Sequence, residues 1–249
     1  HSPIVPCLAV HQGWTTEPSG ISGLANLRDP VEITRHYSRE GIETVIVDIL
    51  DPWERLDEFA PLIERLADTA SVLWVVVSDG RVPSLRSADA LFDAGAGAIG
   101  LSTTAVEDPA TMREVAERRG PERVLGILNV RRVDGHRWGV FIEGGDKKTD
   151  LDAIAWAGAL TEDLGAGLIL PNSLDGEKTG AGYDIPLCRA VSGAVAVPVV
   201  IGGGCARVEH LDEGLAQGRA HLTIVNKATH SGDMAVSAAH DHLRQRGLM

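Results

Sequence analysis

The chain has 249 residues, of which 44% are hydrophobic and 23% charged, a composition typical of a globular protein with a sizeable core. The net charge of −12 argues against nucleic acid or an anionic membrane surface as a partner. No apolar run is long enough to span a bilayer, and the three scattered cysteines lack metal-ligand spacing. We therefore expect a cytoplasmic protein without a metal ion or another cofactor.

Eight short apolar runs alternate with helical patterns along the chain, which is typical of strand–helix units around a parallel sheet. Asp29-Pro30 and Asp108-Pro109 mark helix starts, and Glu32 is expected to complete a capping box on Asp29. Eight units without a dividing linker predict one α/β domain over residues 1–249, a (β/α)8 barrel. The runs occupy residues 4–10, 44–50, 72–77, 98–101, 124–130, 168–171, 197–202 and 222–225.

Two longer segments interrupt this alternation, one after the first run and one after the fifth. Residues 13–28, GWTTEPSGISGLANLR, are rich in glycine, serine and threonine, which fits a mobile lid over a substrate. The stretch RRVDGHRWGVFIEGG predicts a β-hairpin with its turn at Asp134-Gly135. Strand-end phrases also recur, CLAVHQG with ILNVRRVDG, so we expect a barrel built from two similar half-barrels.

Phrases spread over nearly the whole chain carry a resemblance to one family. They include LRDPVEITRHYSREGIE, LSTTAVEDPA, RRVDGHRWGVF, VPVVIGGGCARVEHLDEGLAQGRA and LTIVNKATH. On these phrases the sequence resembles the cyclase subunit of imidazole glycerol phosphate synthase and, more distantly, the phosphoribosyl-formimino isomerase of the same pathway. The resemblance implies a barrel that acts on a phosphorylated small molecule, although such agreement is more specific for homology than for activity.

Compared with the cyclase, this chain lacks both catalytic carboxylates that the resemblance would imply. The cyclase uses two aspartates as acid and base, at the ends of its first and fifth strands, and the matching residues here are Ala9 and Asn129. Neither side chain transfers a proton at neutral pH, and losing one general acid or base costs about 10²–10⁴-fold in rate. We therefore expect a diverged relative in which Asn129 orients the substrate or stabilises developing charge.

The resemblance also bears on the source of ammonia. The family's cyclase receives ammonia from a glutaminase at the amino-terminal face of the barrel, through a ring of charged gate residues. Only one of the four matching gate residues is charged here, and the acidic docking residue corresponds to Gly97. We therefore expect no glutaminase partner. The gate positions are Pro3, Glu43, Ala98 and Leu168.

The turn IGGGC at 201–205 follows the seventh run, where many barrels bind phosphate. We expect the backbone N–H groups of Gly203 and Gly204 to face a phosphate, with Asn226 and Lys227 at the end of the eighth run beside it. A glycine turn that serves packing alone is the alternative.

The symmetry-related loop SDGR at 78–81 carries Asp79 where the family has glycine, and this carboxylate would repel a phosphate. Gly80, Ser102 and Thr103 are candidates for a second phosphate site. Arg81 could compensate for Asp79 or could recognise a carboxylate, since its guanidinium suits either anion. A substrate with a different group at this end is the competing interpretation.

Three side chains are candidates for proton transfer. Asp48 ends the second run, and a site carboxylate and a supporting partner both fit it. Glu177, in LDGEKTG, is either an acid, base or clamp or a solvated loop residue. His11 follows the lost first aspartate, and a histidine in general can transfer protons at neutral pH, but a surface role also fits. Asn172 and Glu17, the latter in place of a family lysine, complete the expected substrate contacts.

Three functions remain open on the sequence. The first is an enzyme of lyase, cyclase or isomerase type that keeps the phosphate anchor and acts on a phosphorylated sugar or nucleotide-like molecule. The second is the parental cyclase reaction at a residual level. The third is a non-catalytic barrel that binds a phosphorylated metabolite. Polar residues at the ends of several strands favour the first over the third.

Overall fold

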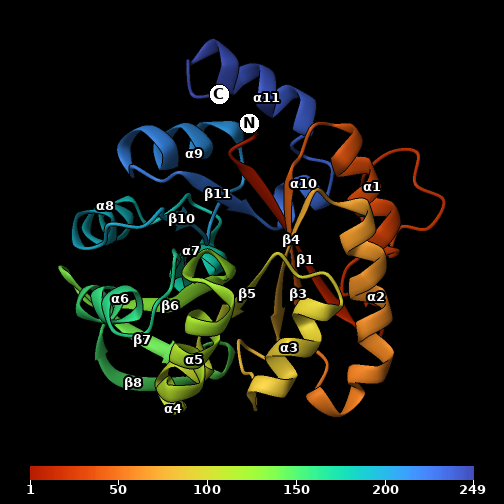
Figure 1. The fold of residues 1–249 in the computed structure, drawn as a ribbon. Helices are drawn as coiled ribbons and strands as arrows, with labels where there is room; N and C mark the ends of the chain where they lie inside the picture. Colours follow the sequence, from red (N-terminus) through yellow and green to blue (C-terminus); the bar gives the residue numbers. More distant parts are fainter.

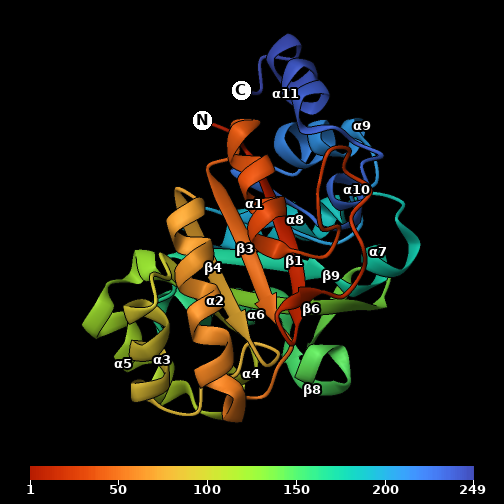
Figure 2. The ribbon, with the colours of Figure 1, turned by 90° about the vertical axis from the view of Figure 1, so that its right-hand side faces the viewer.

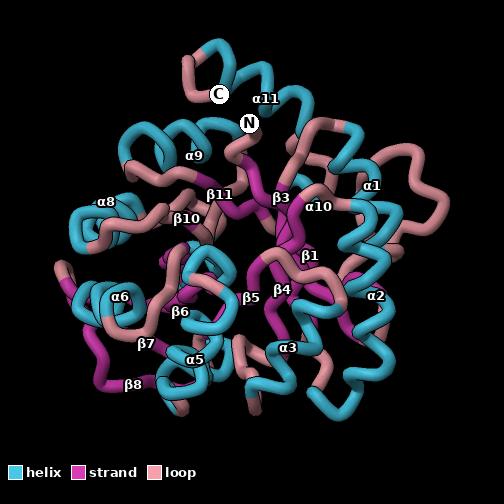
Figure 3. Tube along the Cα trace, viewed as in Figure 1, coloured by secondary structure: helices cyan, strands magenta, loops and turns pink.

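The computed structural model describes residues 1–249 and places eight parallel strands at the centre of the molecule, with helices around them (Figures 1 and 3). Neighbouring strands pair in parallel around the ring, and two bridges, Ile169 with Val199 and Asn172 with Gly202, close it between β9 and β10. The predicted (β/α)8 barrel is therefore confirmed. In order around the ring, its strands are β1 (Ile4–His11), β3 (Thr44–Ile49), β4 (Val72–Val77), β5 (Ala98–Leu101), β6 (Val124–Asp134), β9 (Leu168–Ser173), β10 (Val200–Ile201) and β11 (Leu222–Val225).

The helices cover the outside of this ring, and in Figure 2 α1 and α2 run side by side across the strands β1, β3 and β4. None of them is both long and apolar enough to cross a membrane. The helices are α1 (Pro30–Arg39), α2 (Leu56–Thr69), α3 (Leu85–Asp93), α4 (Thr103–Glu107), α5 (Pro109–Arg119), α6 (Ala153–Glu162), α7 (Leu174–Thr179), α8 (Ile185–Ala194), α9 (Val208–Asp212), α10 (Lys227–His230) and α11 (Val236–Gln245).

Two predicted helix starts are confirmed. Asp29 accepts a hydrogen bond from the backbone N–H of Val31 at the start of α1, and Asp108 caps α5 in the same manner. The predicted capping box between Asp29 and Glu32 does not form. Glu32 does not reach back to Asp29 but accepts from the N–H groups of Ala25 and Asn26, because the preceding loop folds over the first turn of α1.

The wall of the barrel separates two apolar layers. The larger fills the space between strands and helices, and the smaller fills the barrel interior. Since side chains alternate along a strand, the residue two positions beyond each interior apolar residue also faces inward, nearer the carboxyl end. This alternation brings Asp48, Asn129 and Asn172 to the open end of the barrel. The interior layer consists of Val5, Ile46, Trp74, Val76, Ala98, Leu125, Leu170, Val200 and Ile224.

The predicted hairpin is confirmed after the fifth barrel strand, where β6 pairs with β7 (Arg137–Ile142) in antiparallel fashion. Its turn is Gly135-His136, one residue later than expected, because Asp134 still pairs with Arg137 and accepts from the N–H of His136. A third antiparallel strand, β8 (Lys147–Asp152), follows β7 and was not predicted from the sequence.

The loop expected to form a lid is anchored rather than free of the barrel. It begins with a short strand, β2 (Trp14–Thr15), that pairs back on β1. Further along, the hydroxyl of Ser19 and the N–H of Gly20 both donate to the carbonyl oxygen of His230, at 2.8 and 2.9 Å. The loop therefore packs on the segment that follows the eighth barrel strand.

Asp184 fixes the hairpin to the barrel. Its carboxylate accepts from the guanidinium of Arg132 at 2.9 and 3.1 Å and from Nε1 of Trp138 at 2.9 Å. It also caps α8 by accepting from the N–H of Leu187 at 3.1 Å. One buried carboxylate thus joins the hairpin to a helix start.

We expect Asp184→Ala to lower the free energy of unfolding by about 2–4 kcal/mol, because the substitution removes a helix cap and leaves two donors without their acceptor. Chemical denaturation would measure this change. Asp134→Ala is the matched control, since Asp134 forms an exposed ion pair with Arg137 at the hairpin tip and should cost less than about 1 kcal/mol. Equal losses in the two variants would contradict the anchoring role of Asp184.

Candidate functional site

Two contiguous cavities lie at the carboxyl ends of the barrel strands. The larger, of about 860 Å³, lies over β9, β10 and β11, and the smaller, of about 310 Å³, reaches into the barrel mouth. Glu177, Asn226, Gly144, Leu174 and Ile224 line both cavities, so the two form one site with two ends. The combined size suits a small phosphorylated metabolite.

The end over β10 has the geometry of an anion cradle. Gly203 and Gly204 have φ of 93° and 113°, which favours glycine, and an added Cβ on Gly203 would clash with the carbonyl oxygen of Ser173. The backbone N–H groups of both glycines donate to no acceptor in the protein, whereas the carbonyl oxygens of Gly202 and Gly204 are bonded to neighbouring backbone. Two free N–H groups in successive left-handed residues suit an anion.

Three cationic side chains line the same cavity as this glycine turn. Lys227 begins the short helix α10, and its ammonium group forms no ion pair in the protein. Lys178 and Arg131 line the same cavity, Arg131 from β6 and Lys178 from α7. Lys227 and Asn226 thus line the same cavity as Gly203 and Gly204. Arg131 was missed, although its position two residues after Asn129 on one strand puts both side chains on the same face.

Asp48 lies in the barrel mouth, where its carboxyl group lines the smaller cavity. It pairs in register with Ala9 on the adjacent strand, next to the site of the family's first aspartate. Burial, together with the nearby carboxylates of Asp79 and Glu177, raises the pKa of Asp48 to about 7. A carboxyl group with this pKa exchanges protons readily at neutral pH.

A chain of amides connects the opposite wall of the cavity to Glu177. Asn129 and Asn172 pair in register on β6 and β9, and Nδ2 of Asn172 donates to Oδ1 of Asn129 at 3.0 Å. The same Nδ2 lies 2.9 Å from Oε1 of Glu177. Asn172 therefore fixes the orientation of both neighbours, and Nδ2 of Asn129, which donates to no group in the protein, is left for a ligand.

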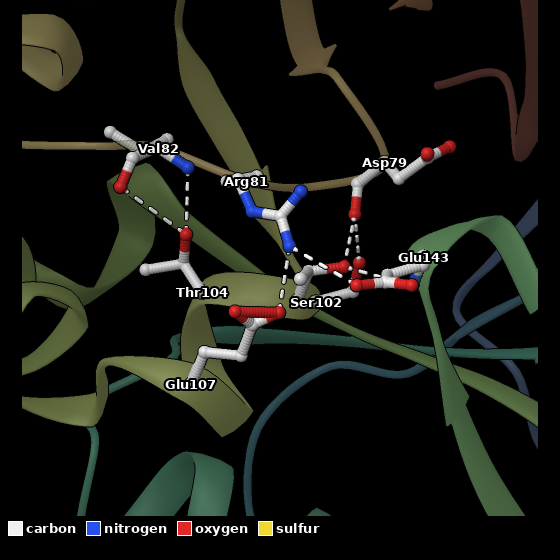
Figure 4. Close-up of polar contacts among 8 residues, drawn as sticks. Asp79, Arg81, Val82, Ser102, Thr104, Glu107 and Glu143 are labelled. Carbon is white, nitrogen blue, oxygen red and sulfur yellow. Dashed lines mark hydrogen bonds and ion pairs between the residues drawn. The ribbon is translucent and has the colours of Figure 1, made fainter. Parts of the chain in front are cut away.

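The loop after β4 exposes a backbone carbonyl oxygen that accepts hydrogen bonds from two neighbouring hydroxyl groups. Ser78, Asp79 and Gly80 all have positive φ, of 48°, 59° and 70°. The hydroxyl groups of Ser102 and Thr103 both donate to the carbonyl oxygen of Asp79, at 2.8 Å (Figure 4). These hydroxyls were candidates for a second phosphate site, and in this structure they bind the protein itself.

Arg81 is likewise engaged by the protein. Its guanidinium lies 2.7 Å from Glu107 and 3.5 Å from Glu143, and the carboxylate of Asp79 points away from it (Figure 4). Burial and the neighbouring carboxylate of Asp146 raise the pKa of Asp79. The end of the site over β4 and β5 is therefore acidic, in contrast to the cationic end over β10 and β11.

Five candidates from the sequence line neither cavity: Gly80, Arg81 and Thr103, which lie behind the wall at the acidic end, and His11 and Glu17. His11 is exposed at the end of β1, and Glu17 is exposed in the first loop, where its backbone carbonyl oxygen accepts from Thr15 and His230. Cys205 follows the glycine turn and lines the larger cavity, but burial raises the pKa of its thiol to about 11. A thiol with this pKa is a packing group rather than a nucleophile at neutral pH.

The opposite end of the barrel carries the four positions that match the ammonia gate. Pro3 and Glu43 directly precede β1 and β3, and Ala98 and Leu168 begin β5 and β9. Leu168 packs against the apolar interior layer, of which Ala98 is a member. Apolar side chains therefore fill this end, and Glu43 contributes the one charge among the four.

The model of the family described as "Histidine biosynthesis protein" matches residues 3–235, which include every barrel strand. The chain belongs to this family, which contains the cyclase subunit of imidazole glycerol phosphate synthase. The resemblance inferred from the strand-end phrases is thereby confirmed.

Proposed function

We propose that this member of the histidine biosynthesis protein family is a diverged enzyme of the cyclase or isomerase type. Its substrate is a phosphorylated sugar or nucleotide-like molecule, held by Gly203, Gly204 and Lys227. Asp48 and Glu177 transfer protons on opposite sides of the substrate, and Asn129 holds a polar substrate group between them. The reaction does not depend on ammonia from glutamine.

One observation carries this proposal. A cradle of free backbone N–H groups and an unpaired carboxyl group with a pKa of about 7 open into one continuous space. A barrel that only binds a metabolite needs the first feature but does not need a carboxyl group with a pKa near neutrality. A strongly raised pKa in a cleft is typical of a group that transfers protons.

Solvent exchange tests the chemistry without knowledge of the substrate. We expect the protein, incubated in D₂O with phosphorylated aldoses, ketoses and ribonucleotide-type compounds, to incorporate deuterium into at least one of them, as measured by NMR. Asp48→Asn should abolish the exchange while the compound still binds. If phosphorylated compounds bind and none exchanges or turns over, a non-catalytic binding role would replace the proposal.

The proposed phosphate anchor, formed by Gly203, Gly204 and Lys227, leads to a separate prediction. Inorganic phosphate or sulfate should raise the Tm of the wild-type protein, because a ligand that binds only the folded state stabilises it. Gly203→Ala should remove this shift, since the added Cβ displaces the loop, and Lys227→Met should weaken anion binding by at least about tenfold.

Gly193→Ala in α8 is the control for the glycine variant, because an added Cβ there meets no atom within 4 Å. It should keep the phosphate-dependent shift in Tm. A crystal soaked in sulfate should show the anion on the N–H groups of Gly203 and Gly204. Anions bound elsewhere, with this loop empty, would contradict the anchor.

The apolar amino-terminal end of the barrel predicts that no glutaminase subunit forms a stable complex with this chain. With Pro3, Ala98 and Leu168 at gate positions, neither the charged ring nor the acidic docking residue of the cyclase is present. Affinity purification from the native source followed by mass spectrometry would test this. A stoichiometric glutaminase together with glutamine-dependent turnover would prove the prediction wrong.

A further inference from the structure

The charges that line the site are distributed unevenly along its length. The larger cavity is lined by three cationic side chains, Arg131, Lys178 and Lys227, and by two carboxylates, Glu177 and Asp233. The smaller cavity is lined by three carboxylates, Asp48, Asp79 and Glu177, and by no lysine, arginine or histidine. A ligand that spans the site therefore meets a cationic end over β10 and β11 and an anionic end over β3 and β4.

Two carboxylates at the anionic end have no partner in the protein. Asp48 is enclosed in the barrel mouth, and neither a hydrogen bond nor an ion pair within the protein acts on its carboxyl group. The carboxylate of Asp79 also accepts no hydrogen bond within the protein, and it points away from Arg81 (Figure 4). Unpaired carboxyl groups at a cavity wall cost free energy unless a ligand supplies the missing donors.

The side-chain donors and the cation that could receive an anion at this end are occupied, which leaves only backbone N–H groups such as those of Asp79 and Gly80. Ser102 and Thr103 donate to the carbonyl oxygen of Asp79, and Glu107 holds Arg81 at 2.7 Å. A phosphate here would face Asp79 without a free hydroxyl or cation. A protonated amine or amidine would instead find two acceptors and a favourable potential.

We infer that the ligand of this site is a monophosphate whose far end carries a cationic amine or amidine group, and not a bisphosphate. The phosphate binds at Gly203 and Gly204, and the cationic group lies between Asp48 and Asp79. This inference rests on the proposed phosphate anchor and adds the chemistry of the other end of the substrate.

A series of alkyl phosphates of increasing chain length tests which group the far end of the site binds and at what distance from the phosphate. The probes are linear ω-aminoalkyl phosphates from propyl to octyl, the matching ω-hydroxyalkyl phosphates, and the matching alkane bisphosphates. Their Kd values would be measured by isothermal titration calorimetry in a buffer free of phosphate and amines. At the best chain length, we expect the amine to bind at least about tenfold tighter than the alcohol and the bisphosphate to bind weakest.

Two variants assign the preference to a residue. Asp79→Asn keeps the backbone carbonyl that Ser102 and Thr103 bind, and asparagine tolerates the left-handed conformation, so the loop should keep its shape. This variant should reduce the amine preference to less than about threefold. Asp146→Asn removes a nearby exposed charge that lines neither cavity, and it should leave most of the preference intact.

The possible results separate the inference from the proposed function. Equal binding of amine and alcohol, or tighter binding of the bisphosphate, would overturn the inference and leave the phosphate anchor standing. If none of the phosphates binds and inorganic phosphate does not shift the Tm, the anchor fails and the inference fails with it. An amine preference that survives in Asp79→Asn but is lost in Asp146→Asn would also contradict the assignment.

Discussion

Replacing Asp48 with asparagine is expected to stabilise the folded protein and to remove most of its activity. The loss of activity follows from the proposed role in proton transfer, since asparagine cannot titrate, and kcat/KM should fall by at least about 100-fold. The gain in stability follows from the same environment that raises the pKa of Asp48 to about 7. An ordinary packing aspartate would show neither effect.

The pH dependence of this stability has a definite sign. Asp48 ionises near pH 3.8 in the unfolded chain and near 7 in the folded protein, so the unfolded state loses its proton first. The contribution of Asp48 to stability therefore falls as the pH rises from about 4 to about 7, by an amount on the order of a few kcal/mol, and is constant above that. Asp48→Asn lacks this penalty.

Urea denaturation between about pH 5 and pH 8 would measure the effect. The difference in unfolding free energy between Asp48→Asn and wild type should grow with pH and level off above about pH 7. A difference that does not change with pH would contradict the raised pKa. In the active enzyme, the ionisation near 7 should be present in the pH profile of kcat/KM for the wild type and absent for the variant.

Glu177→Gln tests the second carboxylate with the geometry preserved, because the glutamine oxygen can still accept from Nδ2 of Asn172. We expect kcat/KM to fall by at least about 100-fold here too. If both carboxylate variants stay near wild type while Asn129→Ala is inactive, the protons are moved by the substrate itself. The roles assigned to Asp48 and Glu177 would then be wrong.

The sequence predicts the barrel well because its signals are local. Eight apolar runs, with Asp-Pro starts or glycine ends on several of the helices between them, give the barrel strands, and alternation along β3 and β6 puts Asp48 and Asn129 on the inner face. The glycine turn at 201–205 is also a local signal. These parts of the site could be placed before any contact between distant residues was known.

The acidic end of the site depends on contacts that no local pattern encodes. From the sequence, Asp79 was expected to repel a phosphate, and the neighbouring Arg81 could have compensated for that charge. The compensation is only partial, because Arg81 is held by Glu107 and by Glu143, residues 26 and 62 positions further along the chain. Thr103 looked like a free donor, yet its hydroxyl reaches back to the carbonyl oxygen of Asp79. Such choices depend on which partners the fold brings together.

Restoring the family's two aspartates is not expected to restore its ring closure. The wild-type protein, supplied with ammonia and the doubly phosphorylated intermediate of histidine biosynthesis, should be slower than the family's cyclase by several powers of ten, because Ala9 and Asn129 transfer no protons. Ala9→Asp combined with Asn129→Asp returns both carboxylates to the barrel mouth. It leaves Asp79 where the second phosphate of that substrate would have to bind.

The double variant should therefore remain far below the cyclase, with weak binding of the intermediate as the main defect. Adding Asp79→Gly removes the opposing charge at a position whose φ of 59° suits glycine, so the triple variant should bind the intermediate at least about tenfold more tightly than the double variant. Steady-state kinetics with ammonia would give kcat and KM for all three proteins. If the double variant turned over like the cyclase without the Asp79→Gly change, two carboxylates would suffice to regain the parental reaction. The acidic loop would then not exclude a second phosphate.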